Sequence, residues 1–451
     1  MKHRTIGINR IWRRVAAVLL CAFLMPGICG CGEFEPFEPL PSPIIEEPIA
    51  GSGSEETDAA GKDTAGSGTA AEDGEGLPVD GTGEEDLTGT EEESMGAEEE
   101  REIDPDTVIH LIMVGDILLH TPVEDCSATG DGGYDYSPIF AAEKATIQAA
   151  DLALVNQEVI IGGAELGVSG YPAFNAPTQI ADALVDTGFD VVLQATNHAL
   201  DKGKAGLVND LTYWEQTYPE IAVLGIQKEA EKQDEIYIYE QGGLRIAILN
   251  YTYGTNGIPL PDDMPYAVNL LDEEKVEADL QKAEELADFT IVCPHWGTEY
   301  RLSPDSMQEK WTEIFRKNGA DLVIGAHPHV IEPIAWIGDE ENPQQMLVYY
   351  SLGNFVNWTS GTGDGVTNRM VGGMAEVDIA WNEEGKAVIA DYGVRALICH
   401  VENGFGGVRV YDLASYTQEL AERNAIVLQD VQFSKDLCVN LCNHVWGGLW
   451  H

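Results

Sequence analysis

The chain has 451 residues, of which 77 are acidic and 25 are basic, so its formal net charge is −52. Nucleic acid is therefore excluded as a main partner, because a surface that binds it needs basic side chains to neutralise phosphates. Apolar and aromatic residues still make up 44% of the chain, which is too many for a disordered acidic protein. Part of the chain must therefore form a folded core.

Residues 1–31 have the organisation of an export signal. They contain five Lys or Arg residues and no acidic residue, and an apolar run occupies residues 15–28. This run is short for a membrane-spanning helix but typical of a signal peptide. The segment ends in Ile-Cys-Gly-Cys at 28–31, which resembles a bacterial lipobox. It implies that Cys31 is lipidated and that the exported protein is anchored in the cell membrane, on its extracellular face. An uncleaved membrane anchor is the alternative.

Residues 32–107 predict a disordered acidic linker. This segment holds 25 acidic and two basic residues, begins Pro-rich and continues as a mixture of Gly, Ser, Thr and Glu. Because it can bury little apolar surface and its charges repel one another, we expect a solvated tether. Binding of a basic partner is the alternative. The other 52 acidic and 18 basic residues belong to 108–451, which we interpret as one folded domain with a net charge of −34.

From residue 108 onward, short apolar runs alternate with amphipathic stretches. The runs that predict buried strands are 108–114, 152–156, 191–195, 221–224, 245–250, 289–294, 322–326 and 347–351. Helical spacing occurs over 137–150, 176–187, 207–216, 272–286 and 306–318. This order predicts an α/β fold that binds ligands at the carboxyl ends of its strands. Alternation over 374–381 and 387–397 predicts a half-exposed second sheet.

The cysteines of the folded part do not predict a disulfide framework, because their number is odd and their spacing is wide. Cys438 and Cys442 lie four residues apart on a predicted C-terminal helix, and we expect them to pack in the core. The five cysteines after Cys31 are Cys126, Cys293, Cys399, Cys438 and Cys442.

Polar side chains follow five of the predicted strands at the point where each strand ends. Since parallel strands end at the same edge of a sheet, we expect these side chains to meet. A mixed set of carboxylate, amide and imidazole donors suits Mn, Fe or Zn better than Ca. Each residue alone has a simpler explanation, as a helix cap, a turn or a buried core residue, so the hypothesis depends on their conjunction. The residues are Asp116, Glu158, Asn197, His198, His295, His327 and His329.

Six motifs occur in order along this part of the chain: GD at 115–116, NQE at 156–158, NHALDKG at 197–203, HWGTEY at 295–300, GAHPH at 325–329 and SLGNF at 351–355. They resemble the motif series of the CapA family, the poly-γ-glutamate capsule synthesis proteins, which are related to the calcineurin-like metallophosphoesterases. The resemblance covers about 108–357, and further strands and helices follow over 358–451. It implies a four-layer α/β/β/α sandwich of the metallophosphoesterase type with two divalent metal ions at the strand ends.

The resemblance also implies roles for single residues. Asp116 and His329 would bind the first ion, Asn197, His295 and His327 the second, and Glu158 would bridge both. Hydroxide held by the ions would attack the substrate. His198, oriented by Asp201, would protonate the leaving group. We further expect substrate contacts from Trp296, Glu299, Tyr300 and Asn175, and from Arg369 as the nearby cation for an anionic substrate.

The chain departs from the superfamily pattern at the first metal site. Ile117 and Leu118 follow Asp116, so the usual Asp-x-His motif lacks its histidine. His120 could replace it, but we expect His120 to be a loop residue. Asn175 stands where relatives often carry Arg, which weakens the case for an anion contact there. A mononuclear or non-catalytic protein therefore stays open.

Two functions follow from this pattern. The first is a metal-dependent hydrolase that acts outside the membrane on a phosphoester or on an amide of an anionic envelope polymer. The second is a non-catalytic metal-binding component that binds, anchors or escorts such a polymer, with other capsule synthesis proteins as partners. An adhesion domain without a site would require all six motifs to be coincidental. Because the domain is itself negative, an anionic substrate must be attracted locally by the metal ions.

Overall fold

The computed structural model describes residues 101–451, except 341, 343–344, 360, 362–364, 403 and 405. The predicted export signal, with Cys31, and the linker up to residue 100 lie outside the described residues. Residues 101–107, which we expected to belong to the linker, contact the folded part instead. Arg101 forms an ion pair with Asp288 at 2.7 Å, and the Asp104 amide donates to the Gly242 carbonyl at 3.0 Å. The folded part thus includes Arg101.

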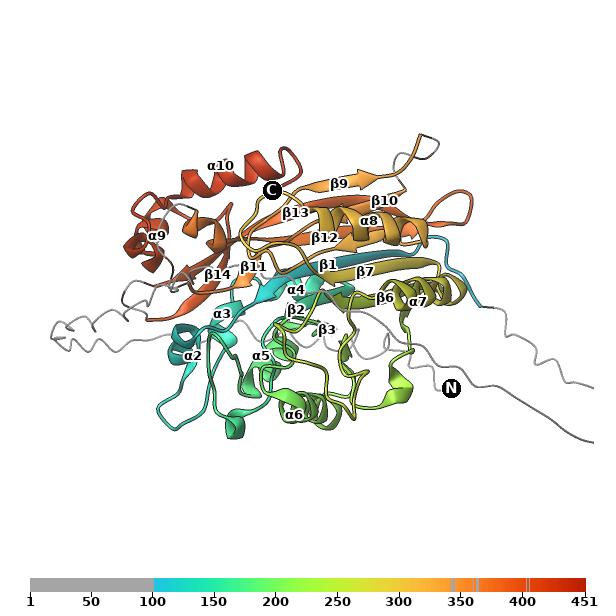
Figure 1. Ribbon diagram of the computed structural model, residues 1–451. Coiled ribbons are helices and arrows are strands. Elements are labelled where there is room, and N and C mark those ends of the chain that lie inside the picture. Colours follow the sequence, from blue (N-terminus) through green and yellow to red (C-terminus); the bar gives the residue numbers. More distant parts are fainter. Residues whose placement is uncertain are drawn as a thin grey trace, which may run out of the picture. The chain divides into compact units, whose positions relative to one another are not determined.

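The first sheet has the strand order β14-β13-β12-β1-β2-β3-β4, and a short strand, β11, pairs with the end of β1 (Figure 1). Strands β1 to β4 are parallel, whereas β12 to β14 form an antiparallel half beside β1. The strands are β1 (Val108–Ile117), β2 (Leu152–Gln157), β3 (Val191–Leu193), β4 (Ala222–Leu224), β11 (Asn354–Val356), β12 (Val371–Trp381), β13 (Ala387–Val401) and β14 (Val408–Asp412).

The second sheet has the order β5-β6-β7-β8-β10-β9. Strands β6, β7, β8 and β10 are parallel, and β5 and β9 are antiparallel edge strands. The strands are β5 (Tyr237–Gln241), β6 (Leu244–Thr252), β7 (Phe289–His295), β8 (Leu322–Ile324), β9 (Ile334–Ile337) and β10 (Met346–Tyr349).

Our expectation for the strands over 374–381 and 387–397 was wrong, because they do not form a second sheet. They are β12 and β13, and β12 pairs antiparallel with β1 from Val108 opposite Ala380 to Val114 opposite Met374. The alternation of a strand indicates which face is buried but not which strand lies beside it. The second sheet is built from the central part of the chain instead.

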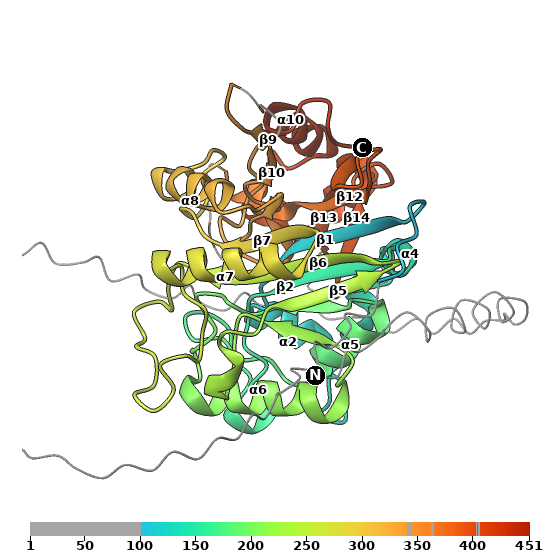
Figure 2. The same cartoon turned by 90° about the vertical axis from the view of Figure 1, so that its right-hand side faces the viewer.

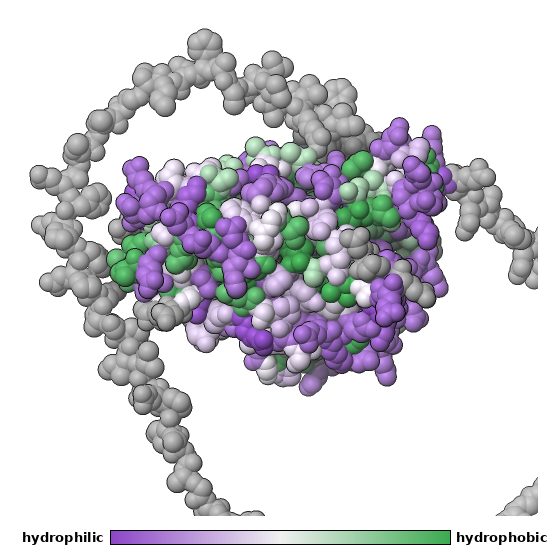
Figure 3. All heavy atoms as spheres, turned by 90° about the horizontal axis from the view of Figure 1, so that it is seen from above, coloured by the Kyte–Doolittle hydropathy of each residue, from purple (hydrophilic) through white to green (hydrophobic). Residues whose placement is uncertain are grey.

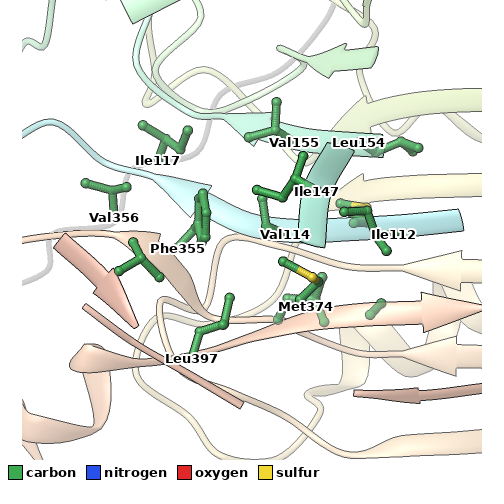
Figure 4. Packing of buried hydrophobic residues seen from close by; sticks show 14 of the residues in the cluster. Ile112, Val114, Ile117, Ile147, Leu154, Val155, Phe355, Val356, Met374 and Leu397 are labelled. Atoms are coloured by element: carbon green, nitrogen blue, oxygen red, sulfur yellow. The ribbon is translucent and has the colours of Figure 1, made fainter. Parts of the chain in front are cut away.

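The two sheets pack face to face and share the main core. Along β6, Ile246 and Ile248 belong to this core, whereas the alternate residues Ala247 and Leu249 face the helices on the other side. A contact of 3.9 Å joins the sulfur atoms of Met113 on β1 and Cys293 on β7. Figure 4 shows another part of the same apolar cluster, where Val114, Phe355 and Met374 of the first sheet lie near Ile147. Apolar burial on the faces of the sheets is therefore the main source of stability.

Helices cover both outer faces, which completes the four layers α/β/β/α and confirms the predicted fold class (Figures 1 and 2). Val276 and Leu280 of α7 and Phe315 of α8 pack on the second sheet. The α-helices are α2 (Thr121–Ser127), α3 (Ser137–Phe140), α4 (Lys144–Ala149), α5 (Gln179–Thr187), α6 (Gly203–Thr217), α7 (Glu273–Leu286), α8 (Ser306–Lys317), α9 (Gln418–Arg423) and α10 (Lys435–Val445). The 3₁₀ helices are η1 (Ala164–Leu166), η2 (Ala230–Lys232), η3 (Val366–Met370) and η4 (Ala425–Leu428).

Local sequence signals agree with several helix ends. Asp305 and Gln308 form a capping box at the start of α8, and Gly188, with φ of 113°, ends α5. The predicted helix over 137–150 is instead divided into α3 and α4. At this break the Glu143 carboxylate accepts a hydrogen bond from the Asp412 amide of β14 at 3.0 Å, a tertiary contact that periodicity does not reveal.

Cys293, Cys399, Cys438 and Cys442 are buried free thiols, and Cys438 and Cys442 lie on α10 as expected. None of the described helices is both long enough and apolar enough to cross a membrane. On the face drawn in Figure 3, hydrophobic residues occur in separate patches among hydrophilic ones, as expected for an acidic domain.

Candidate metal centre

The carboxyl ends of five parallel strands, three from the first sheet and two from the second, deliver the polar side chains to one place. Asp116 lies near the end of β1 and His295 at the end of β7, while Glu158 directly follows β2. The pairing of β1 with β2 is irregular between Val114 and Asp116, and Asp116 lies opposite Asn156 of β2 and Asn354 of β11. The close approach of the Gly353 carbonyl needs glycine at position 115, because a Cβ atom there would collide with that carbonyl.

Two groups of side chains converge there, and they share Glu158. Asp116, Glu158 and His329 form one group, and Glu158, His295 and His327 form the other. Within each group the potential ligand atoms lie within 4.8 Å of one another. Glu158 Oε1 is 3.7 Å from His295 Nε2 and 3.7 Å from His329 Nε2. Asn197 joins the second group, since its Oδ1 is 2.9 Å from His295 Nε2.

The donor atoms of these groups lack partners that buried polar atoms normally have. Glu158 is fully buried, and neither carboxylate oxygen accepts a hydrogen bond from any residue that the structure describes. His327 Nδ1 is also buried and has no hydrogen-bond partner among the described residues. An unpartnered buried carboxylate is costly. A divalent cation would supply the missing partners, so the residues present fit a divalent metal ion.

Burial and neighbouring charges set the protonation of this cluster. Burial raises the pKa of Glu158 well above its usual range, and it lowers the pKa values of His295 and His327 well below theirs. Although burial opposes it, the charge of Glu158 and the contact with Asp116 raise the pKa of His329 to about 9. The lowered pKa values of His295 and His327 favour the neutral imidazole, which is the form in which histidine binds metals.

Two asparagines and a strained turn hold the ligands. Asn156 Nδ2 donates to Asp116 Oδ1 at 2.8 Å and lies 3.3 Å from His295 Nδ1. Asn354 Oδ1 lies 3.1 Å from His329 Nδ1, and its Nδ2 donates to the His329 carbonyl at 2.9 Å. His327 and His329 themselves have positive φ values of 101° and 58°, which are rare outside glycine and are typical of functional sites.

His198 lies beside these groups without belonging to either. Its Nδ1 is 2.7 Å from Asp201 Oδ2, which also accepts a hydrogen bond from the Phe174 amide at 2.7 Å. The Phe174 ring packs edge-on against the imidazole, with 4.7 Å between centroids. His198 Nε2 lies 4.0 Å from Glu158 Oε1. The imidazole is therefore fixed with Nε2 directed at the centre.

The residues expected to contact substrate are divided between the surface and the interior. Tyr300 is 45% exposed, Glu299 is exposed, and the Arg369 guanidinium stacks on the Tyr300 ring at 3.6 Å. Trp296 is fully buried against α8 and donates to the Tyr350 carbonyl at 2.9 Å. Asn175 is also buried, and it donates to the carbonyls of Gly163 and Gly167. Core packing accounts for Trp296 and loop structure accounts for Asn175. The buried positions of these two side chains do not fit a contact with substrate.

His120 is in neither ligand group. Its ring packs edge-on against Phe174, with 5.2 Å between centroids. Burial and the neighbouring charges of His329, His198 and Arg369 lower the pKa of His120 to about 4. His120 is therefore a loop residue near the site. His329 is the one histidine in the group around Asp116.

Sequence reasoning missed one side of the centre. The Tyr253 ring lies 4.7 Å from the His327 ring, and Asn256 Nδ2 lies 3.4 Å from His198 Nδ1. Both follow β6, whose carboxyl end reaches the same edge. The sequence contains a signal for both residues, because they follow the buried strand predicted over 245–250.

The fold and this pair of ligand groups define the chain as an α/β/β/α sandwich protein with a candidate centre for divalent metal. Residues 110–359 match the family described as bacterial capsule synthesis protein PGA_cap. Because the match covers more than half of the chain, the chain belongs to this family, which confirms the resemblance in the motifs.

Two curated relatives come from Bacillus. The PGA biosynthesis protein CapA of Bacillus subtilis (strain 168) is 29% identical over 260 residues, which are 56% of this chain and 65% of that protein. The capsule biosynthesis protein CapA of Bacillus anthracis is 27% identical over 194 residues, which are 41% of this chain and 45% of that protein. The alignments therefore span less than two thirds of either relative.

Solved structures show weaker similarity. A putative 5′-nucleotidase from Staphylococcus aureus matches with a TM-score of 0.40 and 17% identity over 64% of this chain and 54% of that one. A hypothetical protein from Thermus thermophilus matches with a TM-score of 0.36 and 14% identity over 64% of this chain and 98% of that one.

Proposed function

We propose that this protein is a metal-dependent hydrolase in the synthesis of a capsule or a related envelope polymer. It acts on a phosphoester or on an amide bond. A lipid on Cys31 holds it in the cell membrane, on the extracellular face, and the acidic linker separates the domain from the lipid surface. Its substrate is an anionic envelope polymer or a fragment of one, and other capsule synthesis proteins are its partners.

One observation carries the catalytic part of this proposal. Glu158 belongs to both ligand groups, and its two buried oxygens have no hydrogen-bond donor within the described part of the chain. A carboxylate that serves two neighbouring groups is the arrangement expected of a two-metal site. Asp116 and His329 would hold one ion, and Asn197, His295 and His327 the other. When bound, two such ions polarise the scissile bond and make a water molecule acidic enough to react near neutral pH.

His198 supplies the proton that the leaving group needs. The hydrogen bond between Nδ1 and Asp201 fixes the imidazole with Nε2 directed at the centre, so that a proton on Nε2 can reach the leaving group. Nε2 faces the centre at 4.0 Å from Glu158 Oε1, and it gives this proton to the departing oxygen or nitrogen. The Phe174 ring limits other orientations of the imidazole.

The test uses purified full-length protein and separates metal binding from chemistry. Bound metal is counted by elemental analysis, and hydrolysis of p-nitrophenyl phosphate, bis-p-nitrophenyl phosphate and γ-glutamyl p-nitroanilide is followed with added Mn²⁺. His295→Ala should lose bound metal and turnover. His198→Ala should keep its metal and lose about 10²- to 10⁴-fold in rate.

His444→Ala is the matched control, because His444 is exposed on α10 and should affect neither quantity. If the wild-type protein shows neither bound metal nor turnover, the proposal fails.

A non-catalytic role is the second candidate, and a specific observation favours it. The group around Asp116 contains one histidine, and His120 does not join it. A metal ion could then serve recognition or structure while the protein binds, anchors or escorts the polymer. Polymer output in cells distinguishes the two roles. Normal output with His198→Ala and lost output with His295→Ala would indicate binding without chemistry, whereas lost output with both variants would indicate an enzyme.

A further inference from the structure

The exposed aromatic side chains of this protein gather at the metal centre. Among the Phe, Tyr and Trp residues that the structure describes, only Tyr171, Tyr253 and Tyr300 are exposed, with exposed fractions of 77%, 38% and 45%. Tyr171 lies between β2 and α5, Tyr253 follows β6, and Tyr300 follows β7. Exposed apolar residues scattered singly over a surface need no explanation, whereas three exposed rings at one site indicate a binding surface.

Two of the rings lie beside histidines of the two ligand groups. The Tyr253 ring lies 4.7 Å from the His327 ring, and the Tyr300 ring lies 6.0 Å from the His329 ring. Burial and the charge of Glu299 raise the pKa of both tyrosines to about 12. Their hydroxyl groups are therefore neutral at pH 7, and each can both donate and accept a hydrogen bond.

The third ring lies on the side of the centre where the proposed proton donor stands. The Tyr171 and Phe174 rings are 6.4 Å apart at an interplanar angle of 72°, and the Phe174 ring is 4.7 Å from the imidazole of His198. Because most of the Tyr171 ring is exposed, it is open to a ligand that extends outward from His198.

Exposed polar side chains accompany the rings. Asn256 is exposed and follows Tyr253 by three residues on the same loop, and Glu299 is exposed directly before Tyr300. The Arg369 guanidinium lies 3.6 Å from the centroid of the Tyr300 ring. Since Glu299 and Arg369 carry opposite charges, the surroundings of Tyr300 match a neutral ligand better than a strongly charged one.

A pyranose ring has the chemistry that this combination recognises. Its C–H groups form an apolar face that is attracted to the negative face of an aromatic ring, and its hydroxyl groups both donate and accept hydrogen bonds. Amide, carboxylate and phenol groups beside the rings supply partners for such hydroxyl groups. A neutral sugar also avoids repulsion by the acidic domain.

We propose that Tyr171, Tyr253 and Tyr300 form a sugar-binding rim around the metal centre, and that this rim receives the pyranose rings of a neutral glycan segment of the substrate. The inference rests on the proposed function only because it takes the metal centre as the place where substrate binds.

The experiment measures binding to the full-length protein with Mn²⁺ present, so its result does not depend on turnover. The probes are the tetrasaccharides of β-1,4-linked N-acetylglucosamine and of α-1,4-linked glucose, and ligand-observed NMR titration gives the Kd of each. Tyr171→Ser and Tyr253→Ser should each weaken binding of the better probe by about 3- to 10-fold, because each variant lacks one stacking ring. Tyr171→Phe, which keeps the ring, should bind like the wild-type protein.

Val108→Ser is the matched control and should leave binding unchanged, since Val108 is 49% exposed but lies at the start of β1, whereas Asp116 lies near the end of that strand. Thermal unfolding checks that the variants are folded, and if Tyr253→Ser is not, Tyr171→Ser decides. The proposal is overturned if the wild-type protein binds neither tetrasaccharide, or if the serine variants bind as the wild-type protein does. Equally tight binding of adenosine, which has an aromatic base instead of pyranose rings, also overturns it. The proposed function fails separately, through the absence of bound metal and turnover in the wild-type protein.

Discussion

Asn354 connects several parts of the site. Its side chain contacts His329 Nδ1 at 3.1 Å and donates to the carbonyls of His329 and Arg369, both at 2.9 Å. A residue that orients a metal-binding imidazole typically contributes 10- to 100-fold to metal affinity. We therefore expect Asn354→Ala to weaken Mn²⁺ binding by about this factor, which a competition titration against a chelating dye can measure.

The matched control for this variant is Asn318→Ala. Asn318 Nδ2 donates to the Ile314 carbonyl at the end of α8, and it precedes β8, whereas His327 follows that strand. Its loss should lower stability slightly and leave metal affinity unchanged. If Asn354→Ala lowers the melting temperature but binds Mn²⁺ like the wild-type protein, Asn354 has a structural role alone.

The candidate ligands could be recognised from the sequence because parallel strands bring their carboxyl ends together, whatever the details of packing. Asp116, Glu158, His295, His327 and His329 all meet, as their positions after strands predicted. The orientation of a side chain on a loop has no such rule. Trp296 follows His295 directly and is nevertheless turned into the core, where the Tyr350 carbonyl accepts its N–H group.

At the scale of elements, Asp210 joins α6 to the loop after β2 and to the end of β3. It is fully buried, and its Oδ2 accepts hydrogen bonds from the Ile161 amide at 2.8 Å and from Gln194 Nε2 at 2.7 Å. Burial raises the pKa of Asp210 to about 7, against 3.8 for an unperturbed aspartate. The folded protein therefore holds this proton more tightly than the unfolded chain, and the free energy of unfolding falls as the pH rises from 4 to 7.

Asp210→Asn should remove this dependence, because an amide does not titrate. Relative to the variant, the wild-type protein should lose about 2 kcal/mol of unfolding free energy between pH 5 and pH 7. Urea unfolding of both proteins at the two pH values measures the difference, in which other titrating groups cancel. A difference that stays constant with pH would show that Asp210 is ionised in the folded protein throughout this range.

Most elements of the fold could be predicted because they are buried on both faces and read as continuous apolar runs. The strands that were missed, β5, β9, β11 and β14, are short or lie at the edges of the sheets, where the pattern is weaker. The larger error was to assign β12 and β13 to a second sheet, since both belong to the first. Whether β12 pairs with β1 or begins another sheet depends on contacts between residues more than 250 positions apart, which local periodicity does not record.

For the whole molecule, the charge of −52 is unevenly divided along the sequence. The segment over 32–107 accounts for 25 acidic and two basic residues, and the family match begins only at residue 110. If this segment is a tether, a lipid on Cys31 holds the domain near the membrane. Cys31→Ala should move the protein from the membrane fraction to the soluble fraction and abolish labelling by a fatty-acid probe, whereas Cys29→Ala, two residues before it, should change neither. If the apolar run instead stays on the protein as an uncleaved anchor, the Cys31→Ala variant should remain in the membrane fraction without label. Cell fractionation and labelling together therefore distinguish a lipid anchor from a peptide anchor.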